Sequence, residues 1–173
     1  RGRALGVTQL MPEKETFNVG ESILRKRLVM MLGGRAAEKL VFDEVSAGAE
    51  NDIERGTSLA RRMVASWGMS ESVGPVSFKQ SDEHPFLGKE MHTYREFSEE
   101  TARIIDIEVQ TIMQESHEIA TQLLVEYRAE LDLLANALLE HEQIERLQLR
   151  ELLGPRPGAT EEPTETSSDG STE

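Results

Sequence analysis

The chain has 173 residues, which is enough for one ordinary domain with its own core. Its 32 acidic residues outweigh 19 basic ones, and the formal net charge of -13 disfavours nucleic acid or an anionic lipid surface as a partner. Because the chain has no cysteine, any metal must be held by histidine and carboxylate ligands. No apolar run approaches the roughly 20 residues that cross a bilayer, so we expect this piece to be soluble.

The opening of the chain reads as an extended segment. Arg1-Gly2-Arg3 stands where a methionine would begin a complete chain, which suggests a fragment that starts within a domain. The stretch to about Met11 is short, contains β-branched residues and stops at Pro12. It therefore predicts a strand that needs a sheet partner.

The next segment predicts a helix from Glu21 to about Phe42. Gly33-Gly34 falls near its middle, where glycine is unfavourable, so we expect a kink or a close approach by another backbone. The apolar positions that recur at helical spacing are Ile23, Leu24, Leu28, Met31, Leu32, Ala36, Leu40 and Val41.

A second helix follows a short loop. Asn51 or Asp52 is expected to cap it, and Gly68 is a natural stop after about Trp67. Its predicted buried side consists of Ile53, Leu59, Ala60, Met63, Val64 and Trp67.

The second half of the chain predicts further helices. The segment 70–97 reads as irregular, with one strand candidate at 76–78. Ser98 and Thr101 mark the start of a long helix to about Tyr127, and later leucines predict two more helices that turn back on it. The long helix should bury Ala102, Ile105, Val109, Ile112, Ile119, Leu123 and Tyr127, and the later helices should bury Leu131, Leu134, Ala135, Leu138, Ile144, Leu147 and Leu152.

These elements together predict a mostly α fold. We expect a helical bundle with one or two short strands over residues 1–153, divided into an N-terminal half, 1–97, and a C-terminal helical half, 98–153. Residues 154–173 contain mainly Pro, Gly, Ser, Thr and acidic side chains. Such a composition cannot offset the entropy of ordering, so we expect an acidic disordered tail.

The stretch Ser46 to Glu54 is the most informative for chemistry, because a small-residue loop leads into a helix whose first turn carries carboxylates. One interpretation is helix capping, since acidic groups there complement the helix dipole. The other is that Asp52 is a metal ligand, held rigidly at the helix start. The sequence contains no H-E-x-x-H pattern, and each of its four histidines, His84, His92, His117 and His141, is isolated. We assign none of them to a metal.

Seven segments, in this order, resemble the peptidase domain of the FtsH-type ATP-dependent zinc metalloproteases. They cover roughly residues 1–153 at similar spacing. The segments are Arg1-Gly2-Arg3-Ala4-Leu5-Gly6, Leu32-Gly33-Gly34-Arg35-Ala36-Ala37-Glu38, Ser46-Ala47-Gly48-Ala49-Glu50-Asn51-Asp52-Ile53, Ala60-Arg61-Arg62-Met63-Val64, Trp67-Gly68-Met69-Ser70, Leu87-Gly88-Lys89 and Ser98-Glu99-Glu100-Thr101-Ala102-Arg103-Ile104-Ile105-Asp106.

The resemblance implies a zinc endopeptidase joined to a membrane anchor and an AAA ATPase, which binds ATP and Mg. Such proteins act on protein substrates as homo-hexamers at the cytoplasmic side of a bacterial inner membrane, or in the equivalent organelle compartment. In the family two histidines of an H-E-x-x-H helix and a distant aspartate bind zinc, and the glutamate of that motif activates water. The aspartate matches Asp52. Glu38 matches a carboxylate that could orient a histidine ligand, and the plain alternative for it is a helix-surface salt bridge. The resemblance thus implies a helical metallopeptidase-type bundle in which 1–97 is the active-site-side half.

The segment Leu5, Gly6, Val7 and Thr8 resembles the strand beside the family's active-site cleft, where an extended substrate could add as a further strand. The H-E-x-x-H helix, a Walker phosphate loop and a membrane span are absent from these residues. We therefore expect no catalytic residue in this chain and a membrane connection only through segments outside it. The alternative hypothesis is a non-enzymatic helical module for oligomerisation or interaction, carried by the long helix and its successors.

Overall fold

The computed structural model describes residues 19–78 and 97–154. These ranges are mostly α, as predicted, and they contain no β-strand. The predicted strand at 4–8 and the tail beyond Gly154 lie outside the described residues. The elements are α1 (Glu21–Phe42), the 3₁₀ helix η1 (Ala47–Ala49), α2 (Glu50–Ala65), α3 (Glu99–Glu126), α4 (Arg128–His141) and α5 (Arg146–Leu153).

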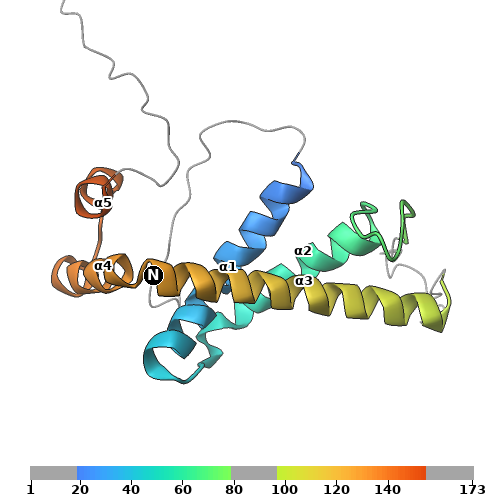
Figure 1. Cartoon of the computed structure of the whole chain (residues 1–173), viewed down its shortest axis with the longest axis horizontal. Coiled ribbons are helices and arrows are strands. Elements are labelled where there is room, and N and C mark those ends of the chain that lie inside the picture. Colours follow the sequence, from blue (N-terminus) through green and yellow to red (C-terminus); the bar gives the residue numbers. More distant parts are fainter. Residues whose placement is uncertain (1–18, 79–96, 155–173) are drawn as a thin grey trace, which may run out of the picture. The chain divides into compact units, whose positions relative to one another are not determined.

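The core of the first compact unit, which ends at Leu124, lies where three helices meet. Figure 1 shows α3 crossing α1 and α2. Each of the three helices contributes apolar side chains to one cluster, so α3 closes the open side of the α1 and α2 pair. The cluster consists of Leu24, Leu28, Ala60, Met63, Val64, Ala65, Ile105, Val109 and Ile112.

The helical periodicity predicted the correct buried face of each core helix, but it assigned too many residues to that face. In α1 the predicted Leu24, Leu28, Leu32 and Ala36 are buried, whereas Ile23 at the edge of the stripe is 40% exposed. In the other helices, too, the buried stripe is narrower than predicted, because the few neighbouring helices cover only part of each apolar face. Other predicted core residues that are substantially exposed are Val41, Trp67, Ile119, Leu123 and Leu138.

The paired glycines of α1 do not have the predicted effect. The helix runs from Glu21 to Phe42 without interruption, and a Cβ placed on Gly33 or Gly34 would meet no atom within 4 Å. The close approach lies instead at Gly56 of α2, where a Cβ would come within 3.2 Å of the Met113 Cε atom of α3. Of the three glycines within α1 and α2, Gly56 is therefore the one that a neighbouring helix packs against.

The end of α2 also differs in part from the prediction. Gly68 has a φ of +62° and stops the helix as expected, with Pro75 packed 3.0 Å from where its Cβ would lie. Val76 to Phe78 does not form the predicted strand. The backbone N–H of Phe78 donates to the carbonyl of Ala65 at the end of α2, so this segment binds a helix terminus rather than a strand partner.

Polar contacts fix α3 against the rest of its unit. Ser98 caps the helix as predicted, since its hydroxyl accepts a hydrogen bond from the Thr101 N–H at 3.2 Å. The carboxylate of Glu108 accepts hydrogen bonds from the hydroxyls of Ser70 and Ser72, at 2.7 Å and 2.8 Å. The loop after α2 is therefore attached to the middle of α3.

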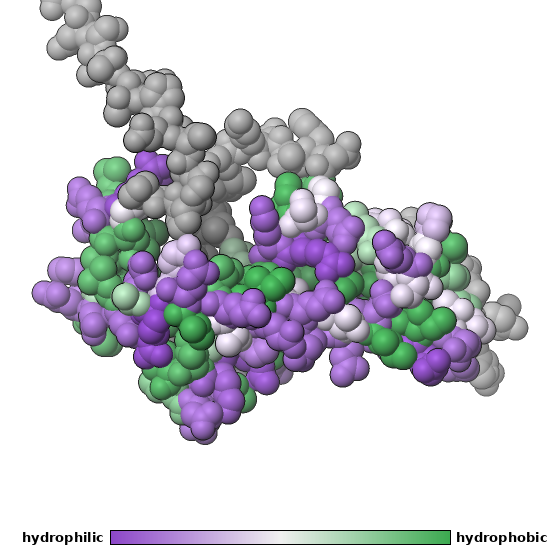
Figure 2. All heavy atoms as spheres, in the orientation of Figure 1, coloured by the Kyte–Doolittle hydropathy of each residue, from purple (hydrophilic) through white to green (hydrophobic). Residues whose placement is uncertain are grey.

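The second compact unit begins at Val125 and contains α4 and α5. Both helices form where the leucine spacing predicts them, but neither contains a buried residue. Leu139 and Leu147 are 83% and 73% exposed, and Figure 2 shows apolar patches among the hydrophilic side chains of the described surface. The expectation that these helices turn back on α3 concerns the relation between two units and stays a prediction.

None of the helices in the ranges 19–78 and 97–154 combines the length and the apolar character needed to span a bilayer.

The packing of α1 gives a first prediction. Leu28 is fully buried between the three helices, so Leu28→Ala should lower the free energy of unfolding by about 2–5 kcal/mol through lost burial and a residual cavity. The measurement is urea unfolding followed by circular dichroism at 222 nm, a wavelength that reports helix content. Met30→Ala is the matched control, because Met30 lies on the same helix with 47% of its surface exposed. The control should change stability by less than about 0.5 kcal/mol. Equal losses in the two variants would contradict the packing described here.

Candidate functional site

The loop between α1 and α2 enters the second helix through a short 3₁₀ turn. The hydroxyl of Ser46 accepts a hydrogen bond from the Gly48 N–H at 3.1 Å and so caps η1. Ala49 is buried and serves as the N-cap position of α2. The prediction that Asn51 or Asp52 caps this helix is therefore wrong, because the helix begins earlier, at Glu50, with no capping hydrogen bond from a side chain.

The carboxylate of Glu38 holds this loop in place. Its Oε2 accepts the Ser46 N–H at 2.9 Å, and its Oε1 accepts the Ser46 hydroxyl at 2.7 Å. These two hydrogen bonds, with a smaller contribution from the nearby Arg35 guanidinium, hold the pKa of Glu38 below its ordinary value of 4.5. Glu38 is therefore ionised at neutral pH and joins the last third of α1 to the start of η1. The hydrogen bonds with Ser46, and not a salt bridge on the helix surface, are therefore the main interactions of Glu38.

Asp52 lies in the first turn of α2 and is half-buried. Among the described residues its carboxylate makes no hydrogen bond and no ion pair. The capping interpretation therefore has no hydrogen bond to support it, although a carboxylate in a first turn still complements the helix dipole. Asp52 and Glu38 lie on opposite sides of the same loop, and only Glu38 has its oxygens engaged.

The described residues do not assemble a metal site by themselves. Within 19–78 and 97–154 no three His, Asp or Glu side chains are grouped so that they could hold a metal ion. His117 lies on α3 beside a shallow pocket, and its buried Nδ1 atom has no hydrogen-bond partner. His141 lies in the last turn of α4. His84, His92 and the proposed substrate-strand residues Leu5, Gly6, Val7 and Thr8 lie outside the described residues.

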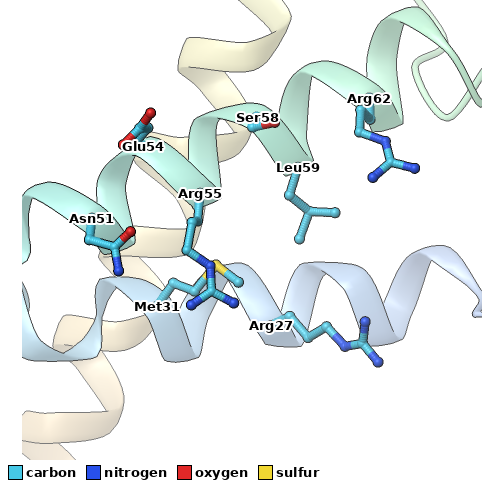
Figure 3. Close-up of a pocket in the computed structure, with 8 residues that line it drawn as sticks. All are labelled: Arg27, Met31, Asn51, Glu54, Arg55, Ser58, Leu59 and Arg62. Atoms are coloured by element: carbon cyan, nitrogen blue, oxygen red, sulfur yellow. The ribbon is translucent and has the colours of Figure 1, made fainter. Parts of the chain in front are cut away.

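A groove between α1 and α2 was not found by sequence reasoning. It has a volume of about 480 Å³, and Figure 3 shows the side chains that line it. The sequence signal for this groove is a set of polar residues at helical spacing on α2, which the pattern of apolar residues does not reveal. The lining residues are Arg27, Met31, Asn51, Glu54, Arg55, Ser58, Leu59 and Arg62.

Comparison with known proteins shows the family to which most of the sequence belongs. The family described as Peptidase family M41 matches residues 1–152. The chain is 51% identical over 155 residues to the ATP-dependent zinc metalloprotease FtsH 1 of Rhodopirellula baltica, an alignment that covers 90% of this chain and 23% of that protein.

Two further relatives show the same pattern. The ATP-dependent zinc metalloprotease FtsH 4 of Sphaerobacter thermophilus is 48% identical over 91% of this chain and 24% of its own length. The ATP-dependent zinc metalloprotease FtsH of Nitrosococcus oceani is 47% identical over 88% of this chain and 24% of its own length. The chain thus spans about a quarter of the curated relatives it matches, and it belongs to peptidase family M41, with the FtsH zinc metalloproteases as its relatives.

Proposed function

We propose that this chain is the C-terminal portion of an ATP-dependent zinc metalloendopeptidase and that Asp52 supplies the carboxylate ligand of its metal. One observation carries the assignment to Asp52. Its carboxylate lies at the start of a well-packed helix, and no described residue engages it. A half-buried carboxylate without a partner is costly unless something else satisfies it.

The described residues fit zinc only in part. They offer one carboxylate, whereas a catalytic zinc site needs three protein ligands and keeps a fourth position open. Because the sequence holds no H-E-x-x-H motif, we propose that both histidine ligands and the glutamate base come from residues outside this chain. When bound, the metal would supply an activated water for attack on a peptide carbonyl.

Glu38 is proposed to position Asp52 rather than to act on substrate. Its two hydrogen bonds with Ser46 fix the loop from which η1 and α2 start, so the first turn of α2 inherits that position. A ligand set loses affinity when its supporting contacts are removed. Both carboxylate oxygens of Glu38 already accept hydrogen bonds from Ser46. Glu38 can therefore also orient a histidine ligand only if one of these oxygens accepts a second hydrogen bond from the imidazole.

The resemblance to the FtsH-type proteases supports a proposal about the complete protein. We propose that the complete protein degrades protein substrates as a homo-hexamer and draws on ATP and Mg bound by an ATPase domain. It would be membrane-associated through segments outside this chain, with the peptidase part on the cytoplasmic side or in the equivalent organelle compartment.

The alternative, a non-enzymatic helical module, is favoured by one observation. No leucine of α4 or α5 is fully buried, and five of them are exposed although both helices are amphipathic in sequence, which is typical of helices that pack against another chain. The exposed leucines are Leu133, Leu138, Leu139, Leu147 and Leu149. An H-E-x-x-H helix encoded in frame ahead of Arg1 would favour the peptidase, and its absence there would favour the module.

Replacement of the proposed ligand tests the site directly. In the complete protein Asp52→Ala should abolish zinc-dependent proteolysis, because a site with two histidines alone holds zinc weakly, while ATP hydrolysis stays near the wild-type rate. Casein cleavage, zinc content and phosphate release measure these three properties. Glu54→Ala is the control, since Glu54 lies two residues further along the same helix, on about its opposite side, and should leave all three unchanged. Proteolysis retained by the Asp52 variant would remove this residue from the site.

The chain on its own gives a second test. We expect it to bind well below one zinc per molecule and to leave casein intact, because the described residues contribute a single carboxylate ligand. Zinc content is measured by atomic absorption after dialysis against buffer with low micromolar metal. A stoichiometry near one would show that this chain holds a complete site.

The pKa of Glu38 predicts how stability depends on pH. Because the folded-state pKa lies below 4.5, the unfolded chain binds this proton more tightly than the folded chain does. The stabilisation is therefore fully present above the unfolded value and is lost as pH falls through the folded value. Glu38→Gln should thus be less stable than the wild type at about pH 7, and the difference should shrink at about pH 3.

Urea unfolding at both pH values measures this effect. Glu44→Gln is the control for the loss of one charge, because no hydrogen bond or ion pair within the described residues involves the Glu44 side chain. A Glu38→Gln difference that stays constant with pH would contradict the contribution from ionisation.

A further inference from the structure

The groove between α1 and α2 carries an unusual concentration of positive charge. Arg27 comes from α1, and Arg55 and Arg62 come from α2. Figure 3 shows the Arg55 side chain pointing toward α1, whereas the carboxylate of Glu54 points away from it. The one acidic residue of the lining therefore does not neutralise the groove.

Two arginines of the groove lack the carboxylate partner that most other arginines of these three helices have. Arg27 and Arg55 form no ion pair with any described residue, and the Arg62 guanidinium lies 4.6 Å from the centre of the Trp67 ring. Outside the groove, three of the four arginines of the same helices form ion pairs with carboxylates, and the fourth, Arg35, interacts with the Glu38 carboxylate only at longer range. These pairs are Arg25 with Glu21 at 2.7 Å, Arg61 with Asp106 at 2.9 Å and Arg103 with Glu100 at 2.9 Å.

This distribution is unexpected in a chain with a net charge of -13. The sequence contains 32 acidic residues, and yet two guanidinium groups at the rim of one groove have no carboxylate partner among the residues that the structure describes. Guanidinium groups bind carboxylates through paired, charge-assisted hydrogen bonds. The groove is therefore complementary to a ligand that brings carboxylates of its own.

The spacing of the charges indicates the shape of that ligand. Arg55 and Arg62 are separated by two helical turns, which is about 10 Å along the axis. A peptide in the polyproline II conformation advances about 3.1 Å per residue with three residues per turn, so acidic side chains three residues apart lie on one face and about match this separation. Between the two arginines the floor of the groove is formed by Met31 and Leu59, both half-buried, which can accept an apolar side chain.

We propose that this groove binds an acidic peptide segment with carboxylates about three residues apart and an apolar side chain between them. Arg27, Arg55 and Arg62 bind the carboxylates, and Met31 and Leu59 contact the apolar side chain. Asn51 and Ser58 add polar groups that can hydrogen-bond the peptide backbone. The binding requires neither zinc nor Asp52, so this proposal and the proposed function fail independently.

Fluorescence anisotropy of the full chain with a labelled peptide tests the proposal. A short peptide of Glu-Leu-Ala repeats should bind, and its affinity should fall as salt is added. The double variant Arg27→Gln/Arg55→Gln should weaken binding at least about tenfold, since each substitution removes a charge-assisted contact. The double variant Arg61→Gln/Arg103→Gln carries the same change in net charge outside the groove and should bind within about twofold of the wild type. Circular dichroism confirms that both variants retain their helices.

Three results would overturn the proposal. The first is equal binding of a peptide in which glutamine replaces every glutamate. The second is an equal loss of affinity in the two double variants, which would show that net charge alone governs binding. The third is full displacement of the peptide by inorganic phosphate at the same anion concentration, which would make the groove a simple anion site.

Discussion

The contact of α3 across α1 and α2 is the constraint on which the rest of the first unit depends. Leu28, Met63, Val64 and Ile105 are its largest fully buried side chains, and they come from all three helices. Neither α1 nor α2 presents enough apolar surface to be stable alone, because short helices gain most of their stability from packing. Once α3 covers them, the positions of both helix ends are fixed.

The candidate site takes its geometry from that packing. The loop between α1 and α2 has few apolar side chains of its own, so it depends on what the two helices offer it. The carboxylate of Glu38 on α1 accepts two hydrogen bonds from Ser46, and the loop then enters α2 through η1. The position of the Asp52 carboxylate is thus set by a chain of contacts that begins in the core and ends at the first turn of α2. Such indirect support is common around metal ligands.

The sequence predicted the helices well because their signals are local. The 3.6-residue period placed α1 at its observed ends, and Ser98 marked the start of α3 through its capping hydroxyl. Features that depend on partners were not predictable in this way. The glycine pair of α1 packs against nothing nearby, whereas Gly56, which has no unusual sequence context, lies against Met113. Similarly, Val76 to Phe78 has strand-like residues but finds only the end of α2 to bind.

The same distinction between local signals and contacts with distant partners applies to the candidate site. The resemblance singled out Glu38 and Asp52 by motif, but the hydrogen bonds of Glu38 with Ser46 depend on how the loop folds back on α1. The arginine groove gave no motif at all, because Arg27 lies 28 positions before Arg55 in the sequence and only packing brings them to one surface. The histidines and the base that the resemblance implies are absent from the sequence, so no reading of this chain could supply them.

The stacking of Arg62 on Trp67 has a practical consequence. The chain contains a single tryptophan. This residue is 41% exposed and lies just after the end of α2, with its ring next to a guanidinium that also lines the groove. All indole emission from this chain therefore originates at one place. A cation held over the ring perturbs the excited state of the indole. The wavelength and intensity of the tryptophan fluorescence therefore report whether Arg62 stays over the ring.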